Sequence, residues 1–432
     1  MTHWFYGVGS KGRGADRFMV MDMTLIERNP GIETRVEFAN MLRGVAVCCV
    51  VLYHFALFWI FPEARKVWAN LDPAGSIPDL TLSFLHEWRL PPGLASGLPF
   101  LGSLSFDLGA FGVALFFLVS GFVIPLSLNR YSRISFSIGR VFRIYPTYIA
   151  GYTIVILAFA ASSVFSGLAF LFRAYEVALS SLPPLNDLVS TVFINPPVWS
   201  LVVELKFYVI CAAIAPLLRE RRVLAFAVPV ALAGLACLVR HQVDDWHSSR
   251  LANDALFCIY IFVGVALSYF WCGYLSRAGA ALLCTTLLSI FLILWPFATD
   301  GQAYSRASSY IAAVVVFVAC MKLPLFVTRA RLARFFADVS YPLYIVHLAP
   351  GFLAMAVASR FVSIWAAVAF GFLCVVGLSA VLHVCIERPT HKLGQYLAVR
   401  ANTKMRQRRS LPAGERGPRQ RRSAYRVSKE SL

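Results

Sequence analysis

The sequence predicts an all-α, polytopic membrane protein. Of its 432 residues, 59% are hydrophobic and only 14% are charged, and the mean hydropathy is +0.68. Long apolar runs also recur along most of the chain. A soluble protein of this composition could not cover its surface with polar side chains, so the soluble globular, disordered, collagen-like and disulfide-scaffold classes are excluded.

Several segments are long and apolar enough to cross a bilayer, since a transmembrane helix needs about 20 mainly apolar residues. They lie at about 41–61, 108–128, 141–165, 198–218, 223–239, 254–271, 278–297, 308–324, 340–358 and 362–386. We therefore predict about ten transmembrane helices.

Basic residues predict the orientation of these helices. Most of the 40 Lys and Arg residues fall before the first helix, after the last one, and in every second loop between them. Because Lys and Arg are retained in the cytoplasm, both termini are predicted to be cytoplasmic, in the inner (plasma) membrane. Topology thus accounts for the net charge of +18, and the lipid bilayer rather than nucleic acid is the expected partner.

The same pattern divides the chain into three regions. Residues 1–34 lack an apolar core and are predicted to be a disordered cytoplasmic segment. Residues 35–392 form the membrane core, and residues 393–432 a basic cytoplasmic tail beside the inner leaflet. The ten cysteines nearly all lie in apolar runs without a C-x-x-C pair, so we expect small buried side chains and no metal site.

Ionisable side chains at membrane depth are costly, so each is a candidate for function. In the first helix, Arg43 and His54 are eleven residues apart, which returns them to within about 20° of one face and separates them by roughly 16 Å. Arg43 would lie near the inner surface and His54 about 10 Å below the outer one. Separately, Arg43 could be a topological anchor and His54 a packing histidine; their shared face favours function.

The third and fourth helices carry two further pairs. Arg140 and Arg143, three residues apart, can form a planar receptor for phosphate, although retention of positive charge inside would also explain them. Ser200 and Glu204 share a face, and Glu204 would lie at nearly the depth of His54, where it could orient the imidazole or share its proton. An ion pair between Glu204 and Lys206 is the alternative, but residues two apart point to different faces.

The last two helices carry weaker signals. His347 could line a cavity or simply pack between helices. Glu387 and Arg388 are predicted to end the final transmembrane helix at the membrane interface.

Taken in order, these motifs resemble acyltransferase family 3, a family of integral-membrane O-acyltransferases. The resemblance covers about 35–387 and rests on the following residues: Arg43 with His54, Gly112-Val113, Phe116-Phe117, Ser120-Gly121-Phe122, Arg140-x-x-Arg143 before Tyr145-Pro146, Trp199-Ser200-Leu201 with Glu204 and Phe207-Tyr208, and Ser340-Tyr341 with Tyr344 and His347. The order of the motifs and their placement on separate helices make the set specific.

The resemblance implies transfer of an acyl group, usually acetyl from acetyl-CoA, to a hydroxyl of a surface or exported glycan or lipid-linked saccharide, without a metal. It implies that His54 is the catalytic base, that Arg43, Arg140 and Arg143 bind the acyl-CoA donor, and that Glu204 is a motif acid. Tyr53, Ser200 and His347 are expected to contact the acceptor. Some relatives carry a fused extracytoplasmic domain; here we expect either completion in the membrane core or a separate extracytoplasmic partner.

Whether His54 acts as a general base or forms an acyl-imidazole stays open from the sequence. Two other functions also stay open: O-acylation of a macrolide-like small molecule, and proton-coupled transport of a glycan precursor. A transporter would be expected to show repeated halves and interrupted helices, and neither is evident in the sequence.

Overall fold

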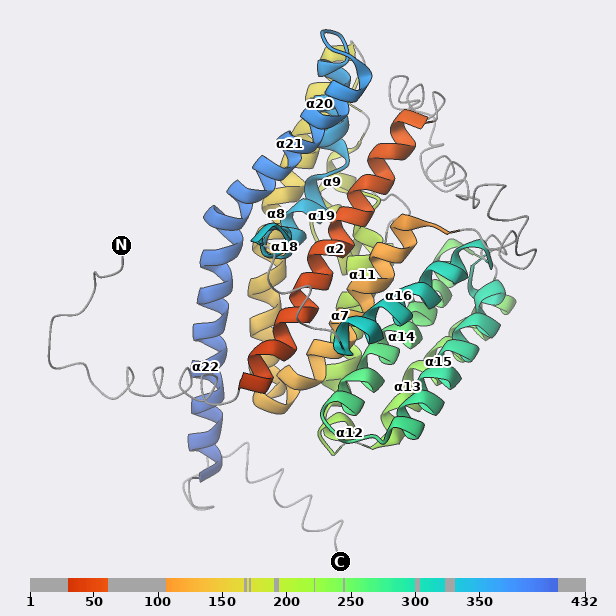
Figure 1. Cartoon of the computed structure of the whole chain (residues 1–432). Coiled ribbons are helices and arrows are strands. Elements are labelled where there is room, and N and C mark those ends of the chain that lie inside the picture. Colours follow the sequence, from red (N-terminus) through yellow and green to blue (C-terminus); the bar gives the residue numbers. More distant parts are fainter. Residues whose placement is uncertain are drawn as a thin grey trace, which may run out of the picture.

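The computed structural model describes residues 30–60 and 106–410, apart from short gaps at 167–168, 171, 190–193, 221, 244, 300–303 and 323–330. Most of the predicted N-terminal segment (1–29) and the end of the predicted tail (411–432) lie outside the described residues. The described part is helical throughout, without strands, which confirms the all-α class (Figure 1).

The main helices follow the predicted order along the chain. They are α2 (Pro30–Ile60), α7 (Leu108–Arg130), α8 (Arg133–Ser166), α9 (Ala174–Ser180), α10 (Pro183–Val189), α11 (Val198–Ala213), α12 (Ala215–Arg219), α13 (Ala227–Gln242), α14 (Trp246–Trp271), α15 (Arg277–Ala298), α16 (Tyr304–Lys322), α18 (Arg331–Asp338), α19 (Ser340–Val346), α20 (Ala349–Ala358), α21 (Ile364–Leu382), the π-helical turn η2 (His383–Glu387) and α22 (Arg388–Ser410).

Among the described residues, seven helices are long and apolar enough to cross a membrane, and the bent pair α19–α20 would make eight. The two remaining predicted spans correspond to shorter helices, α11 and the apolar part of α16. The chain is therefore a multi-pass membrane protein. The count of about ten spans and the cytoplasmic placement of both termini stay predictions.

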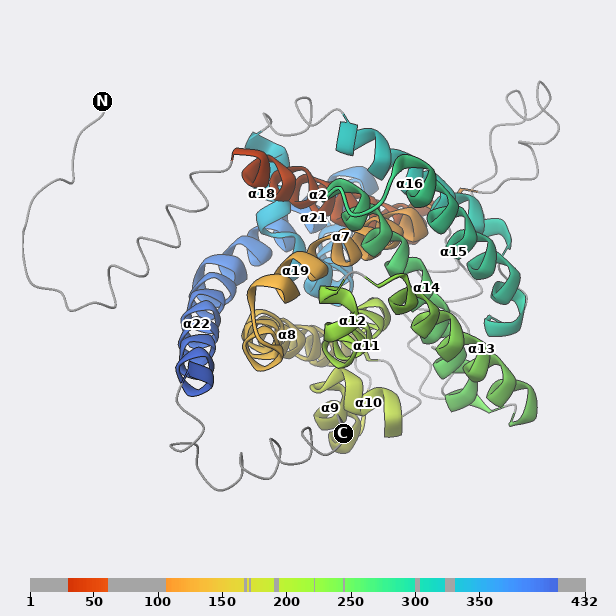
Figure 2. The same ribbon diagram turned by 90° about the horizontal axis from the view of Figure 1, so that it is seen from below.

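Close backbone contacts hold α2, α7 and α14 together at the centre of the bundle (Figure 2). A Cβ on Gly121 of α7 would lie 2.0 Å from the carbonyl oxygen of Ile261 on α14, and one on Gly264 of α14 would lie 2.4 Å from that of Leu118. Small residues allow this approach, which is how helices gain packing energy where lipid gives no hydrophobic drive.

Helix α14 begins at a defined cap, just before its candidate membrane span. The Asp245 carboxylate accepts a 2.7 Å hydrogen bond from the Ser248 amide, and the Ser248 hydroxyl lies 3.2 Å from the Asp245 amide. The hydrogen bond from the Ser248 amide to the carboxylate holds the pKa of Asp245 below its usual range.

The predicted ninth span is interrupted, contrary to the expectation of uninterrupted helices. α19 and α20 meet at an angle of 65° around His347 and Leu348. Pro350 follows the break, and because it has no N–H it cannot continue the hydrogen-bond ladder of α19. The freed carbonyls find side chains instead: Tyr344 O lies 3.0 Å from Nδ1 of His347, and Ile345 O accepts a 2.9 Å bond from Asn195.

The prediction that the last helix ends at Glu387 and Arg388 is wrong. The chain passes through η2, where the amide of Arg388 bonds the carbonyl of His383, and continues as α22 to Ser410. The wider π-helical turn accommodates Pro389, whose missing N–H would interrupt a regular α-helix. In Figure 1, α22 extends past the lower ends of α2 and α8.

Candidate functional site

Two histidines from distant parts of the chain meet inside the bundle. His54 on α2 and His347 at the break between α19 and α20 have ring centroids 5.0 Å apart, and Nε2 of His347 lies 3.2 Å from Nδ1 of His54. His347 is buried and His54 is half-buried. The structure therefore brings together two residues that the sequence predicted separately.

Hydrogen-bond partners define the tautomers of this pair, because a carbonyl oxygen can only accept. Nδ1 of His347 faces the carbonyls of Tyr344 and Leu343, so it carries hydrogen, and in the neutral ring Nε2 is an acceptor. Nδ1 of His54 lies 2.9 Å from the carbonyl of Val50 and also faces His347, so it carries hydrogen too. The lone pair of His54 is therefore at Nε2, which has no hydrogen-bond partner in the described structure.

Ser200 is linked to the histidine pair through Tyr344. Tyr344 donates a 2.8 Å hydrogen bond to the carbonyl of Pro197, and the Ser200 hydroxyl lies 2.7 Å from the Tyr344 hydroxyl. The ring of Tyr344 is 6.0 Å from that of His347. Ser200 thus fixes α19 to α11, and its contact with His347 runs through Tyr344.

The Tyr53 hydroxyl contacts a carboxylate, that of Asp107, which was not predicted from the sequence. Its hydroxyl donates a 3.1 Å hydrogen bond to Asp107, whose other oxygen accepts from the Ala110 amide at the start of α7. Asp107 is buried and interacts electrostatically with His54. An acid just before an apolar run is a helix-cap signal that the sequence offered.

The predicted arginines gather at the other end of the site. Nη2 of Arg140 donates a 3.1 Å hydrogen bond to Ser127, and its guanidinium lies 5.2 Å from the Tyr208 ring centroid. Arg43 interacts electrostatically with Arg143. The guanidiniums of Arg43 and Arg143, both half-buried, make no hydrogen bond or ion pair within the part of the chain that the structure describes.

Glu204 belongs to this arginine group and does not contact His54. Its carboxylate accepts hydrogen bonds from Ser120, at 2.5 Å, and from Tyr208, and it interacts electrostatically with Arg43 and Arg140. Nδ1 of His54 instead lies 3.2 Å from Nε2 of His347; a catalytic role for Glu204 stays a prediction.

The ion pair between Glu204 and Lys206, considered as an alternative, is not formed. Lys206 instead pairs with the buried Asp254 at 2.7 Å. The two side chains leave opposite faces of α11, as their spacing predicted.

Tyr344 connects the two halves of the site. Its hydroxyl lies 2.7 Å from that of Ser200, and its ring packs edge-to-face against Phe116 with ring centroids 5.4 Å apart. It also approaches His347 and interacts electrostatically with Glu204. A path of side-chain interactions through Tyr344 therefore links Glu204 of the arginine group to the histidine pair.

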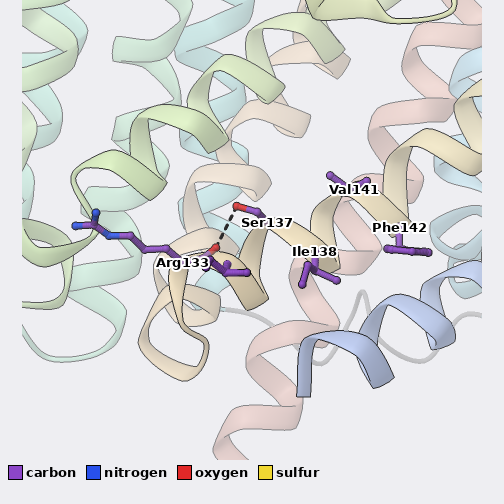
Figure 3. Close-up of a pocket in the computed structure, with 6 residues that line it drawn as sticks. Arg133, Ser137, Ile138, Val141 and Phe142 are labelled. Carbon is purple, nitrogen blue, oxygen red and sulfur yellow. Dashed lines mark hydrogen bonds between the residues drawn. The ribbon is translucent and has the colours of Figure 1, made fainter. Parts of the chain in front are cut away.

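An open groove on the surface of α8 lies apart from this path (Figure 3). It has a volume of about 330 Å³ and is lined by Arg133, Ile134, Ser137, Ile138, Val141 and Phe142. None of the predicted site residues lines it. Among the described residues, no three His, Cys, Asp or Glu side chains are placed to hold a metal ion.

Comparison with known proteins identifies the family of the chain independently of the geometry of the site. Residues 36–384 match the Acyl_transf_3 family, described as an acyltransferase domain. Nodulation protein 10 of Rhizobium leguminosarum bv. viciae is 27% identical over 360 residues, which cover 77% of this chain and 95% of that protein. No solved structure matches the chain.

Proposed function

The chain belongs to acyltransferase family 3, and we propose that this membrane acyltransferase moves an acetyl group from cytosolic acetyl-CoA to a hydroxyl of a cell-surface or exported glycan. The acceptor is a polysaccharide or a lipid-linked saccharide, and the protein works in the inner membrane. Family membership supports the transfer of an acyl group. The acetyl-CoA donor, the glycan acceptor and the inner-membrane location are proposed.

The observation that carries this proposal is Nε2 of His54, which has no hydrogen-bond partner among the described residues, in a ring whose tautomer is set by Val50 and His347. An acyltransferase needs a base whose lone pair faces the substrate, and a neighbouring group that fixes the base's other nitrogen. A packing histidine would have no need of a second, buried histidine.

The arginine group supports acyl-CoA as the donor. Among the described residues, the guanidiniums of Arg43 and Arg143 form no hydrogen bond or ion pair. Guanidiniums bind phosphate strongly, through two parallel N–H···O hydrogen bonds. With the phosphates held at Arg43, Arg140 and Arg143, the thioester arm would extend along α2 towards His54, which is eleven residues or roughly 16 Å away.

In the proposed reaction the acceptor oxygen attacks the thioester carbonyl carbon. Its proton passes to Nε2 of His54, a C–O bond forms, and the C–S bond breaks. The leaving CoA thiolate then takes the proton from Nε2, which restores the neutral ring. His347 accepts from Nδ1 of His54 throughout, and so stabilises the imidazolium that forms during transfer.

Acetyl transfer in isolated membranes tests the assignment. At matched protein levels, His54→Ala should abolish consumption of acetyl-CoA, while Arg43→Ala and Arg143→Lys should raise its KM. Normal turnover in His54→Ala would refute the base. Absence of acetyl-CoA consumption by the parent protein would refute the donor and favour a transporter.

The acceptor is identified by NMR of the source strain's glycans. A deletion strain should lose an O-acetyl signal that the parent shows, and a plasmid copy should restore it. An unchanged glycan, with loss of an acylated macrolide-like metabolite, would instead identify a small-molecule acceptor. Requirement for a separate extracytoplasmic partner would appear as activity in whole cells but not in purified protein.

A further inference from the structure

Helix α22 lies beside the arginine group and outside the part of the chain that matches the family. The match ends at residue 384, whereas α22 runs from Arg388 to Ser410. It packs antiparallel to the first half of α8, the half that carries Arg140 and Arg143 (Figures 1 and 2). This position makes α22 a candidate for contact with whatever the arginines bind.

The register between the two helices is well defined. The Asn402 side chain accepts a 3.2 Å hydrogen bond from the amide of Ser132. A Cβ on Gly139 would lie 4.0 Å from Ala398, and one on Gly394 would lie 2.5 Å from Phe142. Asn402, Ala398, Gly394 and His391 are spaced four, four and three residues apart, so they share one face of α22.

Continued by one turn, this register places His391 beside the turn of α8 from Arg143 to Pro146. His391 is half-buried, whereas its neighbours Lys392 and Leu393 are exposed. It interacts electrostatically with Arg143, Arg140 and Arg43. The Gln395 amide lies 3.4 Å from Nε2 of His391, and if it donates there, Nδ1 carries the hydrogen.

The charges around His391 do not balance within the described structure. Two carboxylates, Glu204 and Glu387, interact electrostatically with Arg43, against three guanidiniums in the group. Neutral hydroxyls of Ser120 and Tyr208 also bond Glu204, and Glu387 lies 2.7 Å from Nδ1 of His383. Among the described residues, neither Arg43 nor Arg143 forms a hydrogen bond or an ion pair. Half-buried charges are normally paired, so the positive charge that the two carboxylates leave over favours a bound anion beside the three guanidiniums.

We propose that His391 donates a hydrogen bond to the diphosphate of the acyl-CoA donor, so that α22 forms one wall of the donor site. This rests on the proposed function for the identity of the donor. The chemistry itself requires only a diphosphate, which three arginines and one N–H donor can surround.

The test uses the purified full chain in lipid nanodiscs, with CoA and inorganic pyrophosphate as probes. Loss of one hydrogen bond to a charged group predicts that His391→Ala weakens binding of both probes about tenfold. His391→Gln, which keeps an N–H donor, should recover binding to within about threefold of the parent. The KM for acetyl-CoA should rise with little change in kcat, while S-acetylpantetheine, which lacks the diphosphate, should react equally well with parent and variant.

Lys392→Ala is the matched control, since it removes a full charge from the exposed face one residue away. It should leave binding within about twofold, because exposed charges are screened. Parent-like binding of both probes by His391→Ala, or an equal loss in Lys392→Ala, overturns the proposal. If His391→Ala misfolds, the same comparison of acetyl-CoA with S-acetylpantetheine in His391→Met, which fills a similar volume but has no N–H donor, decides.

The proposed function fails separately. Weakened pyrophosphate binding in His391→Ala, together with no acetyl-CoA consumption by the parent, would retain the anion site and reject the donor. Normal acetyl-CoA consumption with an unaltered KM in His391→Ala would retain acetyl-CoA as the donor and reject the contact with His391.

Discussion

An imidazole can act as a base only when one ring nitrogen is held protonated and the other is open to substrate. In this protein the backbone break at His347 supplies the holding group, because the unpaired carbonyl of Tyr344 fixes the His347 tautomer. Nε2 of His347 then accepts a hydrogen bond from the Nδ1–H of His54. His347 therefore lies where it can position His54; its contact with the acceptor stays a prediction.

Replacing His347 should lower the chemical step and spare donor binding. With His54 as the proposed base, loss of the acceptor that orients it predicts a fall in kcat of about 100-fold for His347→Leu, with KM for acetyl-CoA nearly unchanged. Steady-state kinetics in membranes measure both constants. His241→Gln, at an exposed histidine on α13, is the control and should match the parent. A variant with full kcat would show that His54 needs no partner.

Replacing Glu204 should change the KM and leave kcat nearly unchanged, the opposite of the effect of replacing His347. Its charge lies among the arginines, so Glu204→Gln removes repulsion towards a bound phosphate and should lower the KM for acetyl-CoA about threefold, with kcat nearly unchanged. Titration of acetyl-CoA against the variant measures this. A fall in kcat of two orders of magnitude, with KM constant, would instead return Glu204 to a role in proton transfer beside His54.

The sequence could predict single site residues because their cost in a membrane is a local property. Spacing on one helix placed Arg43 and His54 on a common face, and Arg140 beside Arg143. It could not pair His54 with His347, because 293 residues separate them and only tertiary packing brings them together. Depth alone suggested Glu204 as the partner of His54, but depth does not say which way a helix faces.

At the scale of elements, periodicity predicted where helices run but not how they bend or end. The 65° break after α19 depends on side chains from other helices, such as Asn195, that satisfy the freed carbonyls. The continuation of α21 into α22 depends on the π-helical turn, for which the sequence gives no rule beyond the presence of Pro389. Both exceptions lie beside the candidate site, where irregular helices are common.

Forcing α22 away from α8 should weaken the donor site without touching its arginines. A Cβ on Gly394 would lie 2.5 Å from Phe142, whereas one on Gly377 of α21 meets nothing within 4 Å. Gly394→Leu should therefore raise the KM for acetyl-CoA, by about tenfold if the hydrogen bond of His391 is lost. Gly377→Leu is the control, expected to behave as the parent. Equal KM values would show that α22 can leave α8 at no cost to donor binding.

Across the whole molecule, the crossing of α7 and α14 should control stability. A Cβ at position 264 would lie 2.4 Å from the carbonyl of Leu118, so Gly264→Ala must separate the two helices and should destabilise the protein by about 1–3 kcal/mol. Gly234→Ala on α13, where a Cβ meets nothing within 4 Å, should be neutral or slightly stabilising. Thermal inactivation in detergent compares them, and equal midpoints would contradict the close crossing.

Orientation in the membrane decides whether the proposed chemistry can use a cytosolic donor. The arginine group lies beside α22, which carries many basic residues, whereas the loop between α20 and α21 holds only Arg360. Positive-inside retention therefore predicts that α22 is cytoplasmic and this loop is external. A fluorescent protein fused after residue 403 should fluoresce, and alkaline phosphatase inserted after Arg360 should be active. Exchanging the two reporters should silence both. The opposite result would place the arginines on the side that lacks acyl-CoA, and a cytosolic thioester could then not be the donor.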